Sequence, residues 1–337
     1  MVLGVGLSTV AIFMVFGVLI GVLFGFFGMG GSLLILPAIL VAGYPADVAA
    51  GNSLAFVFGT AVISVLKHRD HGQIDYKLGA VFLLGGTLLG ETVGHEILNM
   101  LKARGLSNVV VSLILVTILV VMGVIILRDA RSSGDSDSDS DSESESGAAI
   151  QEKVKSFRLP PMMKIKGGIE ISVWVTLAIA FSIGVLAGLI GVGGGFLVMP
   201  AMTYILGAPA AVAVGTDLFQ IVGLGAYGTF LNVSKINLGI VMPLLAGSAL
   251  GARVGASATT VTDGEEIKEY FAVMLLISAV STASKLAANQ YGIEILNTVS
   301  IVFVVGAAFL VTGVIIYTSI QKIREESSSS TAAVAAD

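Results

Sequence analysis

The chain alternates between long apolar runs and short polar connections over most of its length. Most of these runs approach the roughly 20 residues that a helix needs to cross the hydrocarbon core of a bilayer. Five apolar segments precede a long polar stretch, at residues 8–27, 29–43, 48–66, 76–100 and 109–127. Five follow it in the same order, with one more at the end, at residues 171–190, 196–206, 210–231, 238–258, 270–287 and 295–320.

Each half contains nearly the same glycine-rich sequence, which begins within the last part of its first apolar run. The first copy is GVLFGFFGMGGSLLILP, residues 21–37, and the second is GVLAGLIGVGGGFLVMP, residues 184–200. Glycine in a helix interior costs about 1 kcal/mol relative to alanine, so a cluster of glycines ends a helix. Two such breaks, one in each half, are typical of a secondary transporter whose binding site lies where the halves meet.

Two further features repeat between the halves. The third segment carries a short polar patch near its start, Gly51-Asn52-Ser53 in the first half and Gly215-Thr216-Asp217 in the second. The fourth segment has a glycine at every fourth position, a spacing that lets two helices approach closely. These glycines are Gly86, Gly90 and Gly94 in one half and Gly247, Gly251 and Gly255 in the other. The sequence therefore predicts an all-α polytopic membrane protein, with two repeats of about five helical segments, broken helices and one extra C-terminal helix.

The stretch between the halves has a different composition. The sequence SSGDSDSDSDSESESG contains no apolar residue that could be buried, and its charges repel one another, so we expect disorder. Phosphorylation or metal buffering is conceivable there, but a solvated spacer is the simpler interpretation. The predicted organisation is a first repeat over 1–130, an acidic disordered linker over 131–168, a second repeat over 169–290, an extra helix over 291–321 and a polar tail over 322–337.

Basic residues predict how the chain crosses the membrane, because Lys and Arg concentrate in cytoplasmic loops. The first 66 residues contain neither, which predicts an N-terminus outside. The loop after residue 66, the linker and the C-terminus all carry Lys or Arg, so we expect them in the cytoplasm. If each half crosses five times, the two repeats are inverted relative to each other. Three basic residues run against this assignment: Lys102, Arg104 and Lys235.

Composition excludes several classes of function. Hydrophobic residues make up 55% of the chain and charged residues only 12%, against about 25% in soluble proteins. The chain has no cysteine, which excludes disulfides, thiolate metal sites and cysteine nucleophiles. Three scattered histidines, His68, His71 and His95, do not suggest a metal centre, and no dinucleotide, P-loop or HExxH motif is present. We therefore expect no cofactor, no nucleic-acid partner and no enzymatic activity.

The glycine breaks predict an anion site. A helix that starts after a break presents unpaired N–H groups and roughly half a positive charge. Glycine has no Cβ, so an anion can approach the backbone closely. The alternative is that the glycines only allow close helix crossing. The predicted substrate-binding residues are Gly28, Gly30, Gly31, Ser32, Asn52, Ser53, Gly191, Gly193, Gly194, Gly195, Thr216 and Asp217.

Three charged residues inside apolar segments are candidates for ion coupling, because a charge within the bilayer is costly and by default functional. Asp217 either carries a coupling proton or caps a helix that begins after it, and the preceding glycine and threonine favour the cap. Glu91 either pairs with Arg253 of the other half or titrates together with His95, one turn away. The alternative for Glu91 is an exposed helix end.

The pattern GxxxGxxGxGGxxxxxP followed by GNSL, repeated with GTDL in the second half, resembles the sulfite exporter TauE/SafE family. The resemblance covers about residues 18–287 and excludes the linker. It implies an all-helical, internally duplicated permease that moves sulfite, sulfonates or related sulfur oxyanions, driven by protons or another gradient. The sequence departs from the family pattern at Ser32, where the second copy has Gly195, and at Glu91.

The sequence therefore predicts a multi-pass carrier in the cell membrane that moves small anions by alternating access around a midplane site. No ATP-binding motif is present, so an ion gradient would drive transport, with protons as the candidate coupling ion. One alternative is a carrier for another organic acid or ion, with Asp217 and Glu91 as the coupling site. A second is a non-transporting membrane sensor whose linker signals. A third, an intramembrane enzyme, lacks a nucleophile or metal set in the sequence.

Overall fold

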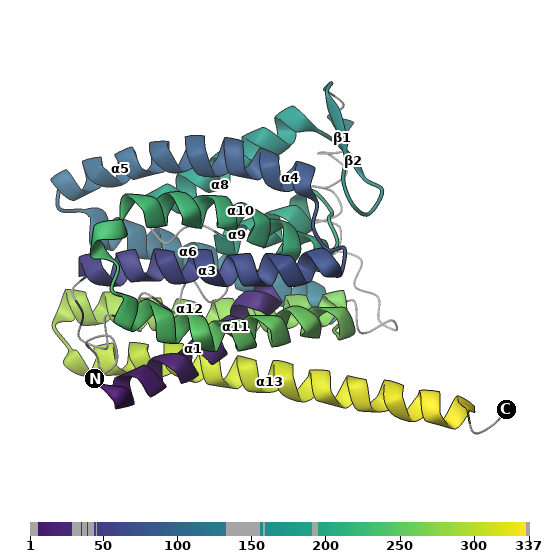
Figure 1. Cartoon of the computed structure of the whole chain (residues 1–337). Coiled ribbons are helices and arrows are strands. Elements are labelled where there is room, and N and C mark those ends of the chain that lie inside the picture. The colour runs from purple at the N-terminus through teal and green to yellow at the C-terminus, as the bar shows by residue number, and fades with distance from the viewer. Residues whose placement is uncertain are drawn as a thin grey trace.

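The structure, a computed structural model, is a bundle of helices that lie roughly parallel or antiparallel to one another (Figure 1). It describes residues 6–28, 46–132, 159–190 and 195–334, and the single positions 35, 39, 44, 156 and 157. Seven helical segments of this part are long and apolar enough to cross a membrane. The predicted fold class, an all-α polytopic membrane protein, is therefore confirmed.

Among the described residues, the first half contains four long helical segments that follow predicted apolar runs, whereas most of the predicted segment at residues 29–43 lies outside the described residues. The third of them is continuous but changes from α to π geometry and back. The segments are α1 (Leu7–Phe27), α3 (Ala46–Asp70), the continuous helix α4 (Tyr76–Val81), η1 (Phe82–Gly90) and α5 (Glu91–Ala103), and α6 (Ser107–Ser132). Helix α3 extends through most of the basic residues that the sequence assigned to a loop.

The second half repeats this order and adds one helix. A short helix, α9, now follows the glycine run, and its end is π-helical. The elements are α8 (Val173–Ile190), α9 (Gly195–Pro200), η2 (Ala201–Ile205), α10 (Ala210–Leu231), the 3-10 turn η3 (Val233–Lys235), α11 (Leu238–Val261), α12 (Gly264–Tyr291) and α13 (Glu294–Val334).

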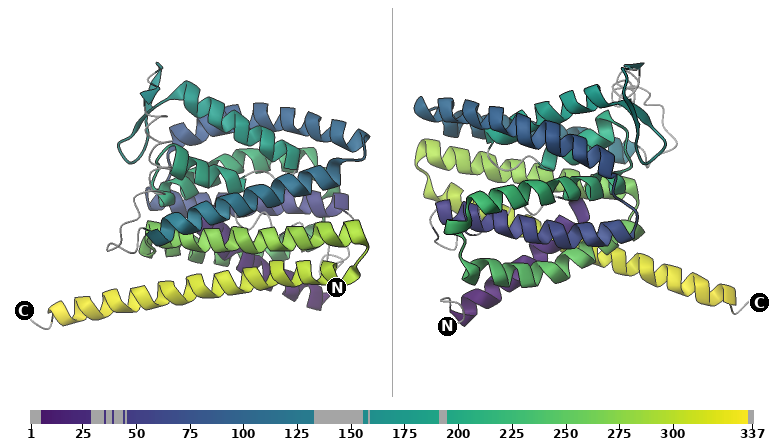
Figure 2. Two further views of the ribbon diagram at one scale, coloured as in Figure 1. Left: turned by 180° about the vertical axis from the view of Figure 1, so that it is seen from behind. Right: turned by 45° about the horizontal axis from the view of Figure 1, so that its top comes forward.

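Helix α13 is longer than predicted and passes beyond the bundle (Figures 1 and 2). Residues 322–334, which the sequence assigned to a polar tail, continue the helix. This stretch contains no Pro or Gly, and adding residues to an existing helix requires no new nucleation. The far end of α13 lies at the same end of the bundle as the β1–β2 hairpin, and α1 begins at the opposite end (Figure 1). Which end faces the cytoplasm stays a prediction.

The last part of the predicted disordered linker forms a small hairpin. Strand β1 (Met162–Lys164) pairs antiparallel with β2 (Glu170–Ser172). Met163, Ile165 and Ile171 are buried, so this stretch has apolar side chains that the acidic repeat lacks. For residues 162–168, the part of the hairpin that lies within the predicted linker, the prediction of disorder is wrong, because buried apolar side chains hold these residues in place.

The first helix of each half packs along the glycine-bearing helix of the other half. Helix α1 lies on α11, where a Cβ atom added to Gly21 would be 2.7 Å from the Cα of Ser248. A Cβ at Gly251 would meet the backbone of α1 in the same way. Helix α8 lies on η1 and α5, and a Cβ at Gly86 would be 2.6 Å from the carbonyl oxygen of Ala180. The glycine spacing thus allows the close approach that it predicts.

The remaining helices of the two halves also pair with each other. Helix α3 packs on α10, and α6 packs on α12. Together with the two glycine contacts, these pairs join each long helical segment described in the first half to a helix of the second half. Helix α13 packs mainly on α12, outside this matched set.

Replacing Gly21 by Val is expected to destabilise the fold by about 1–3 kcal/mol, because the new side chain overlaps the backbone of α11 and forces α1 away. The measurement is thermal unfolding of the full chain in detergent. Gly313→Val is the matched control, since a Cβ at Gly313 in α13 meets nothing within 4 Å. Equal melting temperatures for both variants would contradict the role assigned to the glycine contact.

Candidate functional site

Two helices end inside the protein at the glycine runs. Helix α1 ends at Phe27, and Gly28 follows in the left-handed region with a φ of +88°, where its N–H donates to the carbonyl of Phe24 at 3.0 Å. All residues from Ile20 to Phe27 are buried, and so is Gly28. Helix α8 ends at Ile190, and α9 begins at Gly195. A helix end surrounded by protein is the condition under which interrupted backbone is tolerated in a membrane.

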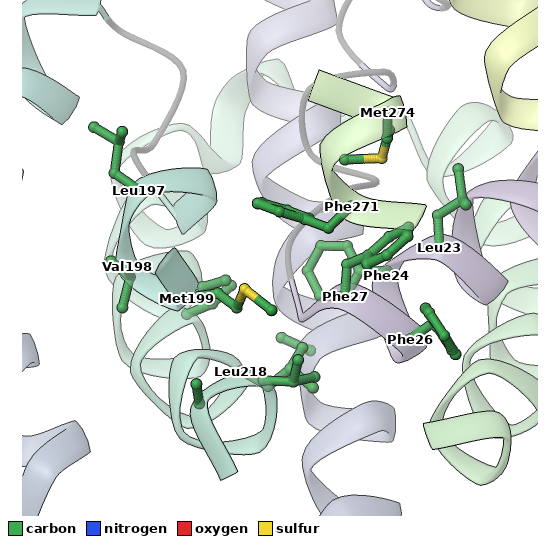
Figure 3. Close-up of a cluster of buried hydrophobic side chains, with 14 of the residues drawn as sticks. Leu23, Phe24, Phe26, Phe27, Leu197, Val198, Met199, Leu218, Phe271 and Met274 are labelled. Carbon is green, nitrogen blue, oxygen red and sulfur yellow. The ribbon is translucent and has the colours of Figure 1, made fainter. Parts of the chain in front are cut away.

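The end of α1 and the short helix α9 both lie against α10. A Cβ at Gly28 would be 3.0 Å from the carbonyl oxygen of Val214 in α10, and α9 packs on the same helix. Figure 3 shows the apolar side chains Phe27, Met199 and Leu218 grouped between the end of α1 and α9. The ring of Phe27 also lies 5.5 Å from that of Phe271 in α12. The end of α1 and helix α9 therefore meet through apolar packing.

Asp217 is the most unusual polar residue of α10. It is fully buried, and neither of its carboxylate oxygens has a hydrogen-bond partner in the part of the chain that the structure describes. One turn further, Gln220 is 4% exposed, and its Oε1 also lacks a partner there. Both side chains therefore bring unused hydrogen-bonding capacity into the interior.

Asp217 does not cap a helix, so this prediction is wrong. Helix α10 begins at Ala210, after Pro209 in the N-cap position, and Asp217 lies in its third turn. Residues 210–214 read AAVAV, and the alanines favour helix strongly enough to start it before the glycine.

Two hydrogen-bonded clusters join the halves near the starts of α3 and α10. Oδ1 of Asn52 accepts from the backbone N–H of Asn237 at 2.7 Å, and its Nδ2 lies 3.3 Å from the carbonyl oxygen of Lys235. In the matching place, Oγ1 of Thr216 accepts from the backbone N–H of Asp75 at 2.9 Å. The side chains of Asn237 and Asp75 in turn cap α11 and α4. Each cluster thus ties the third segment of one half to the fourth segment of the other.

The structure separates the predicted substrate-binding residues. Gly28 lies against the part of α10 that contains Asp217, whereas Asn52 lies beside the connection from α10 to α11, and Ser53 follows it in α3. Ser53 is buried and donates to the carbonyl of Ala49 at 2.7 Å. The remaining predicted residues, apart from Thr216 and Gly195, lie outside the described residues: Gly30, Gly31, Ser32, Gly191, Gly193 and Gly194.

The structure does not contain the predicted pair of Glu91 and Arg253. Glu91 lies at the junction of η1 and α5, half-buried in a hollow of about 10 Å³ that Gln220 also lines. Arg253 lines a separate fissure next to α13. Among the described side chains, no ion pair joins Glu91 to Arg253 or to His95. The helix continues on both sides of Glu91, so it is not a helix end either.

Sequence reasoning missed a buried histidine beside the first break. His68 is fully buried in the last turn of α3, and its Nε2 donates to the carbonyl oxygen of Gly25 in α1 at 2.8 Å. Its Nδ1 lies 2.6 Å from Oε1 of Gln73, which is also 3.3 Å from Oγ1 of Thr259 in α11. His68 thus connects α3 to the end of α1 and, through Gln73, to α11. The only signal was its position in a basic stretch that we assigned to a loop.

The segment after the second break is held by a charged cluster. Tyr204 in η2 donates its hydroxyl to Oδ2 of Asp129 in α6 at 3.0 Å. Lys268 in α12 pairs with the same oxygen at 3.2 Å and with Glu265 at 2.9 Å. No group of three or more His, Asp or Glu side chains in the described ranges is placed to hold a metal ion.

Comparison with known proteins is consistent with these features. The family model of the sulfite exporter TauE/SafE matches residues 13–282. A probable membrane transporter protein of Bacillus subtilis, YunE, is 26% identical over 256 residues, which are 73% of this chain and 87% of that protein. A second one from the same organism, YjnA, is 23% identical over 78% of this chain and 96% of its own length.

An archaeal relative extends the same comparison. The probable membrane transporter protein MJ0441 of Methanocaldococcus jannaschii is 24% identical over 71% of this chain and 83% of its own length. No solved structure matches the chain. The family match covers both glycine runs and all the helices that pair between the halves, except the first residues of α1 and the last residues of α12. The chain therefore belongs to the sulfite exporter TauE/SafE family and is a multi-pass membrane transporter.

Proposed function

We propose that this transporter moves small sulfur oxyanions, such as sulfite and sulfonates, by alternating access around the two glycine breaks. The observation that carries the proposal is that α1 and α8 both end within the protein interior, and that the first break and α9 both lie against α10. Interrupted helices at matching places in two repeats are typical of central binding sites in secondary transporters. The name of the family supports the class of substrate.

An anion is the substrate that a glycine-rich break suits best. The helix α9 begins at Gly195, the last glycine of the second run, so its first N–H groups follow directly on the glycines. Free N–H groups at a helix start attract negative charge without the cost of burying a cation. The absence of a Cβ lets an oxyanion approach the backbone. We therefore place the substrate at the two glycine runs.

The direction of the helices supports alternating access. Asn52, near the start of α3, contacts Lys235 just after α10 ends. Thr216, near the start of α10, contacts Asp75 just after α3 ends. Helices α3 and α10 occupy the same place in their halves and run in opposite directions. This is the relation that inverted repeats require, and it lets the two sides of the membrane gain access in turn.

Asp217 is the proposed coupling residue. A buried carboxylate without a partner is costly, so the group gains stability when it binds a proton or a cation. It lies one turn from Val214, which contacts Gly28 at the end of α1. Binding of a proton or a cation to Asp217 would thus act directly beside the end of α1, at the first break. An ion gradient can drive transport through this residue. The same coupling would serve the alternative function, a carrier for another organic acid in which Glu91 contributes.

Gly30→Val and Gly193→Val are each expected to lower sulfite flux in proteoliposomes at least about tenfold, because a side chain on the proposed amide surface keeps the anion away. The flux of labelled sulfite, measured with protein that elutes and melts as a folded species, tests this. Gly313→Val should transport like the natural protein, since its side chain meets open space. Unchanged anion binding and flux in both break variants would remove the glycine runs from the site.

Asp217→Asn is expected to abolish the acceleration of sulfite flux by a pH gradient while anion exchange without a gradient continues, because the amide cannot take up or release the proton. The expected loss is at least about tenfold in the gradient-driven rate. Glu96→Gln, at an exposed position of α5, is the matched control. If Asp217→Asn responds to the gradient like the natural protein and Glu91→Gln does not, coupling belongs to Glu91.

A further inference from the structure

A fissure of about 690 Å³ opens between the C-terminal ends of α3 and α11 and the middle of α13. It lies at the end of the bundle that carries the β1–β2 hairpin, because Lys166 from the hairpin loop donates to the carbonyl of Gly72, just after α3, at 2.7 Å. None of the residues that line it belongs to the glycine runs. Its apolar wall is formed by side chains from all three helices: Ile63, Leu66, Val254, Val261, Ile316 and Ile320.

Two cations line this fissure without an ion-pair partner in the described chain. They are Lys67, in the last turn of α3, and Arg253, which is exposed two turns before α11 ends. Asp70 also lines the fissure but lies within ion-pair distance of neither. An exposed guanidinium within a membrane-spanning helix is costly unless it reaches an anion. The balance of two cations and one carboxylate leaves the fissure net positive.

We propose that the fissure binds one anionic phospholipid, with its phosphate between Lys67 and Arg253 and an acyl chain along the apolar wall. Arginine suits phosphate because its planar fork donates two parallel hydrogen bonds. Basic pockets between transmembrane helices near the membrane surface are typical sites for anionic head groups. Ser257 also lines the fissure and can supply a hydroxyl donor, whereas Ser319 donates its hydroxyl to the carbonyl of Ile315 in its own helix.

The apolar wall distinguishes a lipid from a small soluble anion. Sulfite or sulfate would satisfy the cations but would leave the Ile, Leu and Val side chains of the wall uncovered. The fissure is also much larger than a small oxyanion needs. A phospholipid satisfies both parts, and the bilayer supplies it at high local concentration. The lipid would then hold α13, which packs mainly on α12, against α3 and α11.

The first experiment is native mass spectrometry of the delipidated full chain, titrated with phosphatidylglycerol or phosphatidylcholine. We expect one phosphatidylglycerol to bind in preference to phosphatidylcholine. The double variant Lys67→Gln/Arg253→Gln should weaken phosphatidylglycerol binding about thirtyfold and leave phosphatidylcholine unchanged, since each cation near a phosphate contributes about a fivefold factor. Arg69→Gln, in the same turn of α3 but outside the fissure, should bind like the natural protein.

The second experiment fills the fissure and keeps both cations. Val254→Trp, at a position 47% exposed and therefore free to accept a larger side chain, should weaken phosphatidylglycerol binding to a similar extent. Glycerol 3-phosphate and sulfate, which have no acyl chain, should not displace the lipid. The proposal would be overturned if glycerol 3-phosphate or sulfate displaced the lipid completely. It would also be overturned if Val254→Trp or the double variant bound phosphatidylglycerol like the natural protein, or if Arg69→Gln lost as much binding as the double variant. Neither experiment depends on transport of sulfite.

Discussion

Close backbone contact between helices of opposite halves is the constraint on which this structure depends. Lipid offers no hydrophobic force that would drive one apolar helix onto another, so the helices associate through shape. At Gly21 and Gly86 the backbone of a partner helix occupies the space that a side chain would need. Helices α1 and α8, which end at the breaks, are therefore held by close backbone contact with helices of the other half. The ends of α1 and α8 lie in the interior because this contact keeps both helices among the helices of the other half and away from the lipid.

Most helices could be predicted from the sequence, because bilayer thickness sets the length of an apolar run. Helix α10 begins and ends where the hydropathy pattern placed it. The errors lie at polar ends. Helix α3 continues to Asp70 and α13 to Val334, since polar residues with adequate helix propensity extend a helix past the hydrocarbon core. The β1–β2 hairpin was missed because its few apolar positions lie in the stretch after the acidic repeat, which was assigned to the same linker up to residue 168.

The candidate site could be predicted as an interruption of the backbone but not as a set of side-chain contacts. The repeated glycines showed where two helices end. They could not show that Asn52 and Thr216 bind the backbone of the opposite half, because partners more than a hundred residues away leave no local pattern. The sequence did not predict His68 as a buried contact residue either, because its partner Gly25 lies in another helix. Asp217 was assigned as a cap because the helix-forming strength of the preceding alanines was underestimated.

The pairing of each helix with one from the other half has a consequence for biosynthesis. The partner of α1 is α11, and more than 200 residues separate them in the chain. At roughly 5–20 residues per second, a ribosome needs on the order of ten to forty seconds to deliver α11 after α1 has entered the membrane. During that interval the glycine face of α1 has only lipid or the insertion machinery as a neighbour. The contact between α1 and α11 therefore forms well after α1 has entered the membrane, whereas α8 can pair with η1 and α5 earlier in synthesis.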